Sequence, residues 1–227
     1  MAEKIDLYDL VSTLILGVLG VCWAAVCFPL LKTAGIPALP EGFATVALLA
    51  LSLFVGQLIQ ALASMVEPVL TWTFGGRASD VVLSKGLGKR YLPLDTALRI
   101  REKLVAAAHR PGSSHHSLFL FAMQRANAAS ASRCERFNGL YAYHRGLFVF
   151  VFFAAAMLGV SSRHGAAASW PSALRGPLIW TALCLLVLVW YRTKQRALYY
   201  VREVLLTAER VLDDASHNAS NTPKGMD

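Results

Sequence analysis

Charged residues are scarce in this chain. Only 16% of its 227 residues are Asp, Glu, Lys or Arg, whereas 56% are hydrophobic and the mean hydropathy is +0.48. A soluble domain of this length needs more polar side chains to cover its surface. The composition therefore excludes an ordinary soluble protein and predicts one that lies in a lipid bilayer.

The motifs of catalysis are also lacking. The sequence has no HExxH, no nucleophile elbow and no pair of carboxylates arranged for acid–base work. His109, His115 and His116 have no carboxylate or cysteine at a ligating spacing, so we interpret them as parts of a solvated loop. We expect no enzymatic activity, no metal and no cofactor.

Cysteine is limited to four residues. Cys22, Cys27 and Cys184 lie in apolar runs, and Cys134 lies in a segment that we expect to face a reducing compartment. Cysteines in these places do not form a disulfide framework.

The most prominent feature of the chain is its long apolar runs. Four of them contain no Asp, Glu, Lys or Arg and approach the length needed to cross roughly 30 Å of hydrocarbon. Arginines bound the two shortest runs and can snorkel to the headgroups. The runs are residues 10–31, 42–66, 146–162 and 176–191. The acidic flank MAEKIDLYD argues against a cleavable signal peptide at the first run.

The cations are unevenly distributed. Twelve of the 22 Lys and Arg lie between Glu67 and Arg145, and six more follow from Arg192. The positive-inside rule then places both termini and the middle segment in the cytosol.

We predict an all-α, four-helix transmembrane fold whose long helices extend into a cytosolic helical stalk. The expected parts are two spans in 1–66, a basic helical region in 67–145, two spans in 146–191, a coiled-coil-like helix in 192–215 and a disordered tail in 216–227.

Within the middle segment, Gly75-Gly76 should end the second span, and a Gly-rich loop should run to Pro93. Asp95 is expected to cap a basic amphipathic helix that ends near His109. From His116 no Gly or Pro occurs until Asn138, so we expect one helix of about 45 residues that enters the third span. The fourth span should continue through a short seam formed by Leu198, Val201, Leu205, Ala208 and Leu212.

The sequence KGLGKRY, residues 85–91, concentrates three cations, Lys85, Lys89 and Arg90. It is not a P-loop, because Leu83 and Arg90 stand where that motif has Gly and Ser or Thr. Either these cations lie on anionic headgroups or they bind a phosphorylated ligand without hydrolysing it.

Arg125, Arg133 and Arg136 fall close to one face of the long helix expected from His116. They either pair with acidic residues of the neighbouring helix, namely Glu203, Glu209 or Asp213, or form a surface that binds a polyanion. Both interpretations remain open from the sequence.

A polar stripe follows the second span. Ser52, Gly56, Gln60 and Ser64 recur every four residues, with Gln57 adjacent and Glu67 at the cytosolic end. Such a stripe either lets helices pack closely or lines water. In the second case Gln57, Gln60, Ser64 and Glu67 would line a pore that favours cations.

Three short sequences carry a resemblance. KIDLYDL before the first span, GQLIQAL in the second and RFNGLYAYHRGL before the third resemble small four-pass bacterial membrane proteins of anti-phage defence loci, over residues 4 to about 211. The chain is similar to the channel effector of the Hailong system. Members of that group more often have Gly-His where this chain has Gly56-Gln57.

The resemblance implies an ion channel gated by a cytosolic nucleotide or DNA oligomer, which depolarises the membrane and aborts infection. It also implies a homo-oligomer, expected to be a tetramer, and a nucleotidyltransferase partner from the same locus. The other function that we weigh is a non-conducting membrane anchor or sensor that recruits a cytosolic defence protein.

Overall fold

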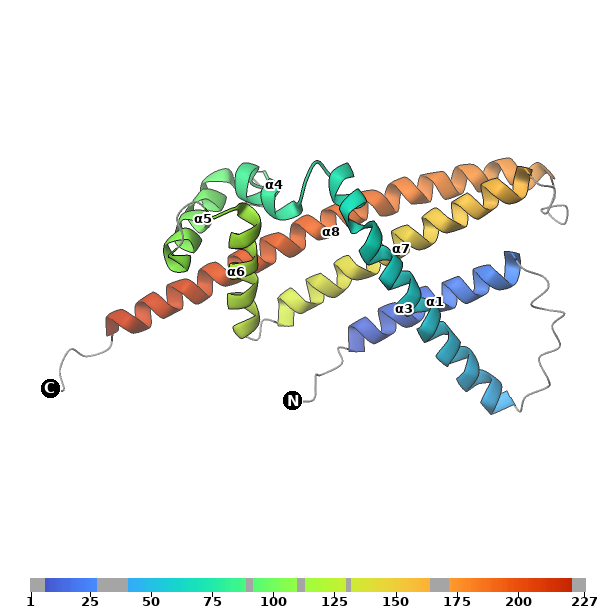
Figure 1. Ribbon diagram of the computed structural model, residues 1–227, viewed down its shortest axis with the longest axis horizontal. Coiled ribbons are helices and arrows are strands. Elements are labelled where there is room, and N and C mark those ends of the chain that lie inside the picture. Colours follow the sequence, from blue (N-terminus) through green and yellow to red (C-terminus); the bar gives the residue numbers. More distant parts are fainter. Residues whose placement is uncertain are drawn as a thin grey trace. The chain divides into compact units, whose positions relative to one another are not determined.

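The fold is known from a computed structural model, which describes residues 7–27, 41–88, 92–109, 113–129, 132–163 and 172–221 (Figure 1). The described residues are helical and form no β-strand, so the all-α expectation is confirmed. The helices are α1 (Leu7–Cys27), α3 (Glu41–Thr73), α4 (Ala78–Lys85), α5 (Leu94–Ala108), α6 (His115–Ala128), α7 (Ser132–Arg163) and α8 (Ser172–Asn221).

Four of these helices are long and apolar enough to cross a membrane. The candidate spans lie in Asp9–Val26, Gly42–Lys85, Arg133–Val160 and Gly176–His217, on α1, α3, α7 and α8. Large apolar side chains are exposed along all four helices, as expected where lipid replaces water. The chain is thus a multi-pass membrane protein by length and composition.

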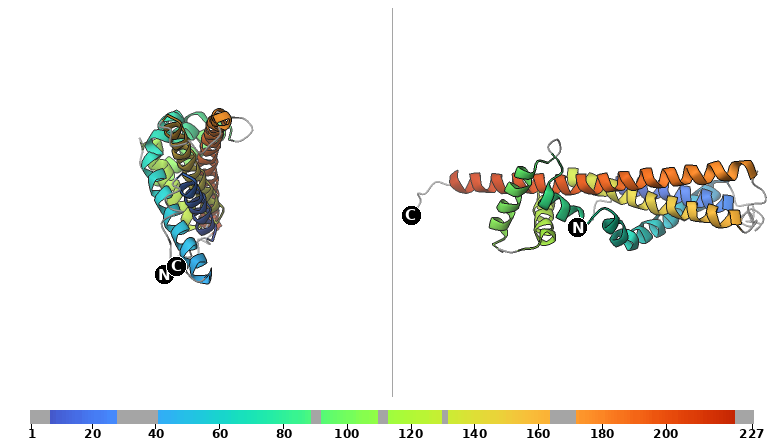
Figure 2. Two further views of the ribbon diagram at one scale, coloured as in Figure 1. Left: turned by 90° about the vertical axis from the view of Figure 1, so that its right-hand side faces the viewer. Right: turned by 90° about the horizontal axis from the view of Figure 1, so that it is seen from above.

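The chain divides into two compact units. Unit 1 comprises Met1–Pro68 and Gly139–Thr193, and unit 2 comprises Val69–Asn138 and Lys194–Asp227. Both α7 and α8 are uninterrupted helices that contribute to each unit, as the continuous ribbons of Figure 2 show.

Unit 1 is built on a close crossing of α1 and α3. A Cβ added to Gly17 would lie 1.6 Å from the backbone oxygen of Ser52, and one added to Gly56 would lie 2.1 Å from that of Thr13. Only glycine permits two helix backbones to approach this closely, which is a common mode of packing in membranes. The side chains of Thr13 and Ser52 are buried at the same crossing.

The third helix of unit 1 packs beside this crossing. A Cβ on Gly146 of α7 would meet the side chain of Leu16 at 2.6 Å and that of Gln60 at 3.4 Å. Leu16 is fully buried. On α8, Thr193 donates hydrogen bonds to the carbonyl oxygens of Val189 and His144, at 2.7 and 3.2 Å, which ties α8 to α7.

Unit 2 has a conventional apolar core. The helices α4, α5 and α6 each bury one face there, and the central side chains of α5 are Ala97, Ile100 and Leu104. The predicted seam on α8 packs into this core, with Val201, Leu205 and Ala208 buried and Leu198 and Leu212 partly buried. The seam therefore contacts a small helical module rather than one partner helix.

The end of α3 follows the sequence expectation. Gly75 and Gly76 have positive φ angles of 89° and 120°, and their N–H groups donate to the carbonyl oxygens of Trp72 and Thr71. This pair of bonds is a Schellman motif, which ends a helix with its last carbonyls satisfied.

The loop expected between Gly76 and Pro93 is wrong in part, because residues Ala78–Lys85 form α4. This short helix exists because Val82 and Leu83 are completely buried in the core of unit 2. After it, the backbone N–H of Leu87 donates to the carbonyl oxygen of Leu92 at 2.8 Å. The cap expected at Asp95 is also wrong, since α5 begins at Leu94 and Asp95 lies inside its first turn.

The single helix expected from His116 is the main correction. The helix α6 ends at Ala128 and α7 begins at Ser132, so the helical run is broken between them. Asn and Ser are weak helix formers here, and the break lets α6 bury Leu118, Phe119, Ala122 and Ala126 in the core of unit 2. Arg125 and Arg136 consequently lie on different helices and do not share one helix face.

The tail was also predicted to begin too early. Residues 216–221 continue α8 to Asn221, and 222–227 lie outside the described residues. The helix extends past the apolar seam because no Pro or Gly follows Leu212 before Pro223.

Candidate functional site

The polar stripe of α3 is divided between two environments. Ser52 and Gly56 are buried in the crossing with α1, which is the close-packing use of such a stripe. Gln57 and Ser64 are exposed, and Gln60 is half-buried beside Gly146. The Ser64 hydroxyl donates to the carbonyl oxygen of Gln60 at 3.1 Å. Only the second half of the stripe is therefore accessible from outside the chain.

Glu67, at the end of the stripe, is engaged by α7. Its carboxylate accepts a hydrogen bond from the Tyr141 hydroxyl at 3.2 Å and forms an ion pair with Arg145. The other end of the Arg145 guanidinium donates to Ser64 Oγ at 3.0 Å, and the guanidinium also lies over the Tyr141 ring. The negative charge that we expected at a pore mouth is thus balanced within the same unit.

Arg145 is the residue of this cluster that the sequence did not reveal. Its side chain is only 13% exposed, and its Nε is buried without a hydrogen-bond partner. Arginines that bound the apolar runs are expected to snorkel to headgroups, whereas Arg145 is held by Glu67. Nothing in the spacing indicated this contact, because 78 residues separate Glu67 from Arg145.

The predicted ligand-binding cations have different surroundings. Arg125 on α6 is exposed, and its guanidinium lies 5.2 Å from the centre of the Phe121 ring. Arg136 on α7 and Lys85 at the end of α4 are exposed. Lys89 and Arg90 lie outside the described residues.

Arg133 pairs with an acidic residue of α8, which is the first of the two alternatives that the sequence left open. Its Nε lies 2.9 Å from Oε1 of Glu203, whose side chain is buried on α8. An ion pair in this position holds the start of α7 against α8, and Cys134 adds a contact from its Sγ to Thr207 at 3.5 Å. The charge of Arg133 is therefore offset within unit 2, in contrast to that of Arg136.

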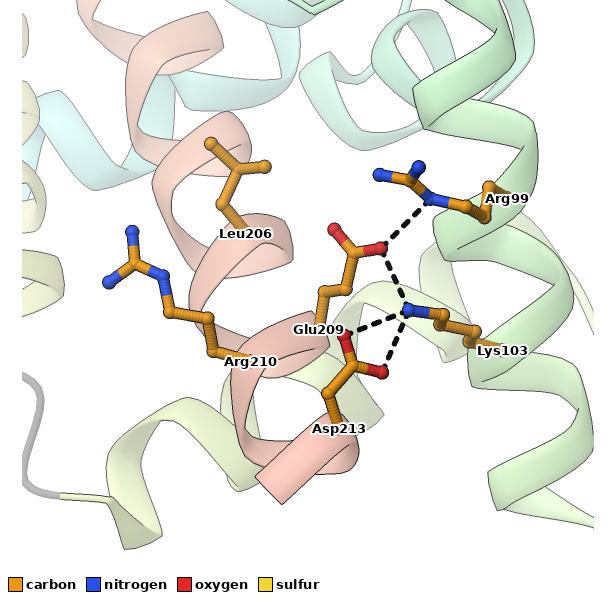
Figure 3. Close-up of a pocket in the computed structure, with 6 residues that line it drawn as sticks. All are labelled: Arg99, Lys103, Leu206, Glu209, Arg210 and Asp213. Carbon is orange, nitrogen blue, oxygen red and sulfur yellow. Dashed lines mark hydrogen bonds and ion pairs between the residues drawn. The ribbon is translucent and has the colours of Figure 1, made fainter. Parts of the chain in front are cut away.

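The two other acidic residues considered as partners, Glu209 and Asp213, contact α5 instead (Figure 3). Oε1 of Glu209 accepts from Arg99 Nε and Lys103 Nζ, both at 3.1 Å, and Lys103 also reaches Asp213 at 2.8 Å. These four side chains, together with Leu206 and Arg210, line an open cavity of about 330 Å³. The hydrogen bond to Asp213 is the main cause that raises the pKa of Lys103 above its usual value of 10.5, against a lowering by burial. This cluster attaches α5 to α8.

Metal binding is not indicated in the part of the chain that the structure describes. No three His, Cys, Asp or Glu side chains there lie close enough to hold an ion.

No protein-family model, no curated protein and no solved structure matches this chain.

Proposed function

We propose that this chain forms an oligomeric ion channel of the bacterial inner membrane, with both termini in the cytosol. It acts as an effector of anti-phage defence, and a cytosolic anionic signal, a nucleotide or a short DNA oligomer, opens it. Opening depolarises the membrane and aborts infection. A nucleotidyltransferase encoded in the same locus is the proposed source of the signal.

The observation that carries this proposal is the continuity of α7. One uninterrupted helix bears Arg136 near its start and, nine residues later, Arg145, which holds Glu67 at the end of the polar stripe. At 1.5 Å per residue the two arginines are about 14 Å apart along the helix. An anion that binds Arg136 and then displaces α7 would act directly on the Glu67 ion pair.

The Glu67–Arg145 ion pair supplies the switch. While Arg145 is paired with Glu67, the two opposite charges largely cancel, and the carboxylate attracts nearby cations only weakly. Release of the pair in several protomers would produce a ring of carboxylates beside Gln57, Gln60 and Ser64, which favours cations. The signal opens the channel only if it binds the open state more tightly than the closed state.

Liposome flux measurements test the proposal. Purified protein is reconstituted, and ion flux is recorded with and without short DNA oligomers and cyclic nucleotides. Flux that depends on one of these ligands is expected, and the double variant Arg125→Glu/Arg136→Glu should abolish it by reversing two exposed charges. Arg101→Glu is the matched control, since Arg101 is an exposed cation on α5 outside the proposed site.

Unchanged ligand affinity in the double variant would contradict the binding part of the proposal. The conducting part is tested separately by Gln60→Leu, which should reduce flux without changing affinity. Flux that stays at the wild-type level would remove Gln60 from the ion path.

A second candidate function is a non-conducting membrane anchor that recruits a cytosolic defence protein. The observation that favours it is the use of Ser52 and Gly56 for packing against α1, which leaves a shorter polar stripe for a pore. This candidate predicts no flux with any ligand from a folded protein in the bilayer, and capture of a cytosolic partner through unit 2.

A further inference from the structure

The last turns of α3 bury one side and expose an apolar side. Leu70 and Phe74 are buried in unit 2, whereas Val69 and Trp72, on the other side of the helix, are 59% and 80% exposed. Large apolar side chains exposed on a helix that is long enough to cross a membrane are covered by lipid or by another protein. The exposed side of this segment therefore has an occupant that the chain itself does not supply.

The exposed side continues an apolar stripe along α3. Phe54, Leu58, Met65, Val69 and Trp72 lie within about 60° of one another at 100° per residue, and all are exposed. Ser52, Gly56 and Ala63, which are buried, occupy the opposite face. The stripe is thus the outer face of α3 along its length.

The kind of residue on this face argues for lipid. Met65, Val69 and Trp72 are large, apolar and exposed, and they lie in the candidate membrane span that begins at Gly42. Trp is enriched at the headgroup level of membranes, where its apolar ring and its polar N–H both find a suitable environment. Trp72, near the end of α3, is therefore expected at that level.

The charge pattern after Trp72 agrees with this placement. The Schellman turn at Gly75-Gly76 is followed by Arg77 and then by Lys85, which are both exposed. An apolar stripe, an interfacial Trp and then cations is the order in which a helix leaves a bilayer containing anionic lipids.

We propose that the α3 segment 65–73 is a lipid-binding surface, with Trp72 inserted among the headgroups and upper acyl chains of the membrane that α3 crosses. The segment was assigned to the cytosolic region from the sequence, because the uncharged run ends at Val66. The inserted Trp72 fixes the depth of α3 and brings Arg77, five residues later, to the headgroup phosphates. This inference depends neither on ion conduction nor on which side of the membrane faces the cytosol.

Tryptophan quenching tests it in the full-length protein. Wild type and Trp72→Phe are reconstituted in liposomes of phosphatidylcholine and phosphatidylglycerol, and the difference between their emission spectra isolates Trp72. Two sets of liposomes carry phosphatidylcholine brominated near the headgroup or near the chain ends, and a third set receives aqueous acrylamide. Trp72→Tyr repeats the subtraction with a side chain of similar size, in case the Phe variant is misfolded.

We expect blue-shifted Trp72 emission that loses most of its intensity to bromine near the headgroup, less to bromine at the chain ends and little to acrylamide. The lipid control is Trp180, an exposed residue in the candidate span of α8, removed in Trp180→Phe. The aqueous control is Leu94→Trp, made in the Trp72→Phe protein, since Leu94 is exposed on α5.

Two results would overturn the proposal. Strong quenching of Trp72 by acrylamide with little by either lipid would place the segment in water. Protection from all three quenchers would mean that protein covers it, and a second copy of this chain would then be the occupant.

Discussion

Each of the two units of this protein is stabilised internally by a different kind of packing. In unit 1, helix backbones touch through Gly17 and Gly56, and large apolar side chains point outward. In unit 2, side chains such as Ile100, Leu104 and Leu205 fill an interior, and ion pairs lie at its edge. The difference shows that one chain can combine close backbone packing in one unit with side-chain packing in the other.

The reason is the source of the packing energy. Lipid tails are as apolar as leucine, so burying leucine between membrane helices contributes little, and close backbone contact takes its place. In water the same burial contributes about 25 cal/mol per Å² of apolar surface. Each unit should therefore fail by a different kind of substitution.

The largest effect is expected from Gly17→Val in unit 1. The new side chain would overlap the backbone of Ser52, and α1 and α3 would have to separate. We expect a stability loss of at least about 3 kcal/mol, measured by thermal unfolding in detergent. Gly159→Val is the matched control, because a Cβ at Gly159 meets no atom within 4 Å. Equal unfolding temperatures for the two variants would contradict the crossing.

Leu104→Ala is the substitution expected to destabilise unit 2, as Gly17→Val destabilises unit 1. Leu104 is completely buried, and its truncation leaves a cavity that costs about 3 kcal/mol. Hydrogen exchange is expected to show lost protection in α4, α5 and α6, with α1 unchanged. Leu98→Ala, at an exposed position of the same helix, should change stability by less than about 0.5 kcal/mol. Exchange that rises equally in α1 would argue against separate units.

Glu67→Gln probes the charged cluster that Glu67 forms with Arg145 in unit 1. The change leaves the Arg145 guanidinium nearly buried without its carboxylate. The expected loss is about 2 kcal/mol, less than for a fully buried pair because Glu67 is half-exposed. Chemical or thermal unfolding in detergent measures it. Glu102→Gln, at an exposed carboxylate of α5, serves as the control. A neutral result at Glu67 would show that water replaces the ion pair without loss.

The smallest effect is expected at the edge of unit 2, from Lys103→Met. Ion pairs in solvent contribute about 1 kcal/mol or less, so the difference from wild type should be of that order and shrink with salt. Because the pKa of Lys103 is raised, its contribution is complete below 10.5 and disappears as the pH rises through the raised value. Unfolding measured between neutral and strongly alkaline pH tests this. A difference that grows at alkaline pH would reverse the sign.

How far the sequence could lead differs between the fold and the site. The four apolar helices, the Gly75-Gly76 end of α3 and the buried face of α5 follow from local composition and periodicity, and the structure confirms them. The break between α6 and α7 does not, because that stretch has no Gly or Pro and helix propensity alone is a weak guide.

The candidate site was less predictable than the fold. That Gln57, Gln60, Ser64 and Glu67 share a helix was visible, but the contact of Glu67 with Arg145 joins residues far apart in the chain. Arg133 and Arg136 are three residues apart, yet only Arg133 is placed against the buried Glu203. Local sequence patterns identify candidate charged residues, but they do not show which residue each of them pairs with.

The sequence by itself determined that the chain is helical and lies in a membrane, because the free energy of transfer from water to lipid depends on residue type and run length alone. Only the tertiary structure decided which polar groups are already paired, where the long helix breaks and which side of α3 stays uncovered. These outcomes depend on contacts between residues distant in sequence. A hydrophobic pattern of period 3.6 shows that a helix has an apolar face, but not which other segment packs against that face.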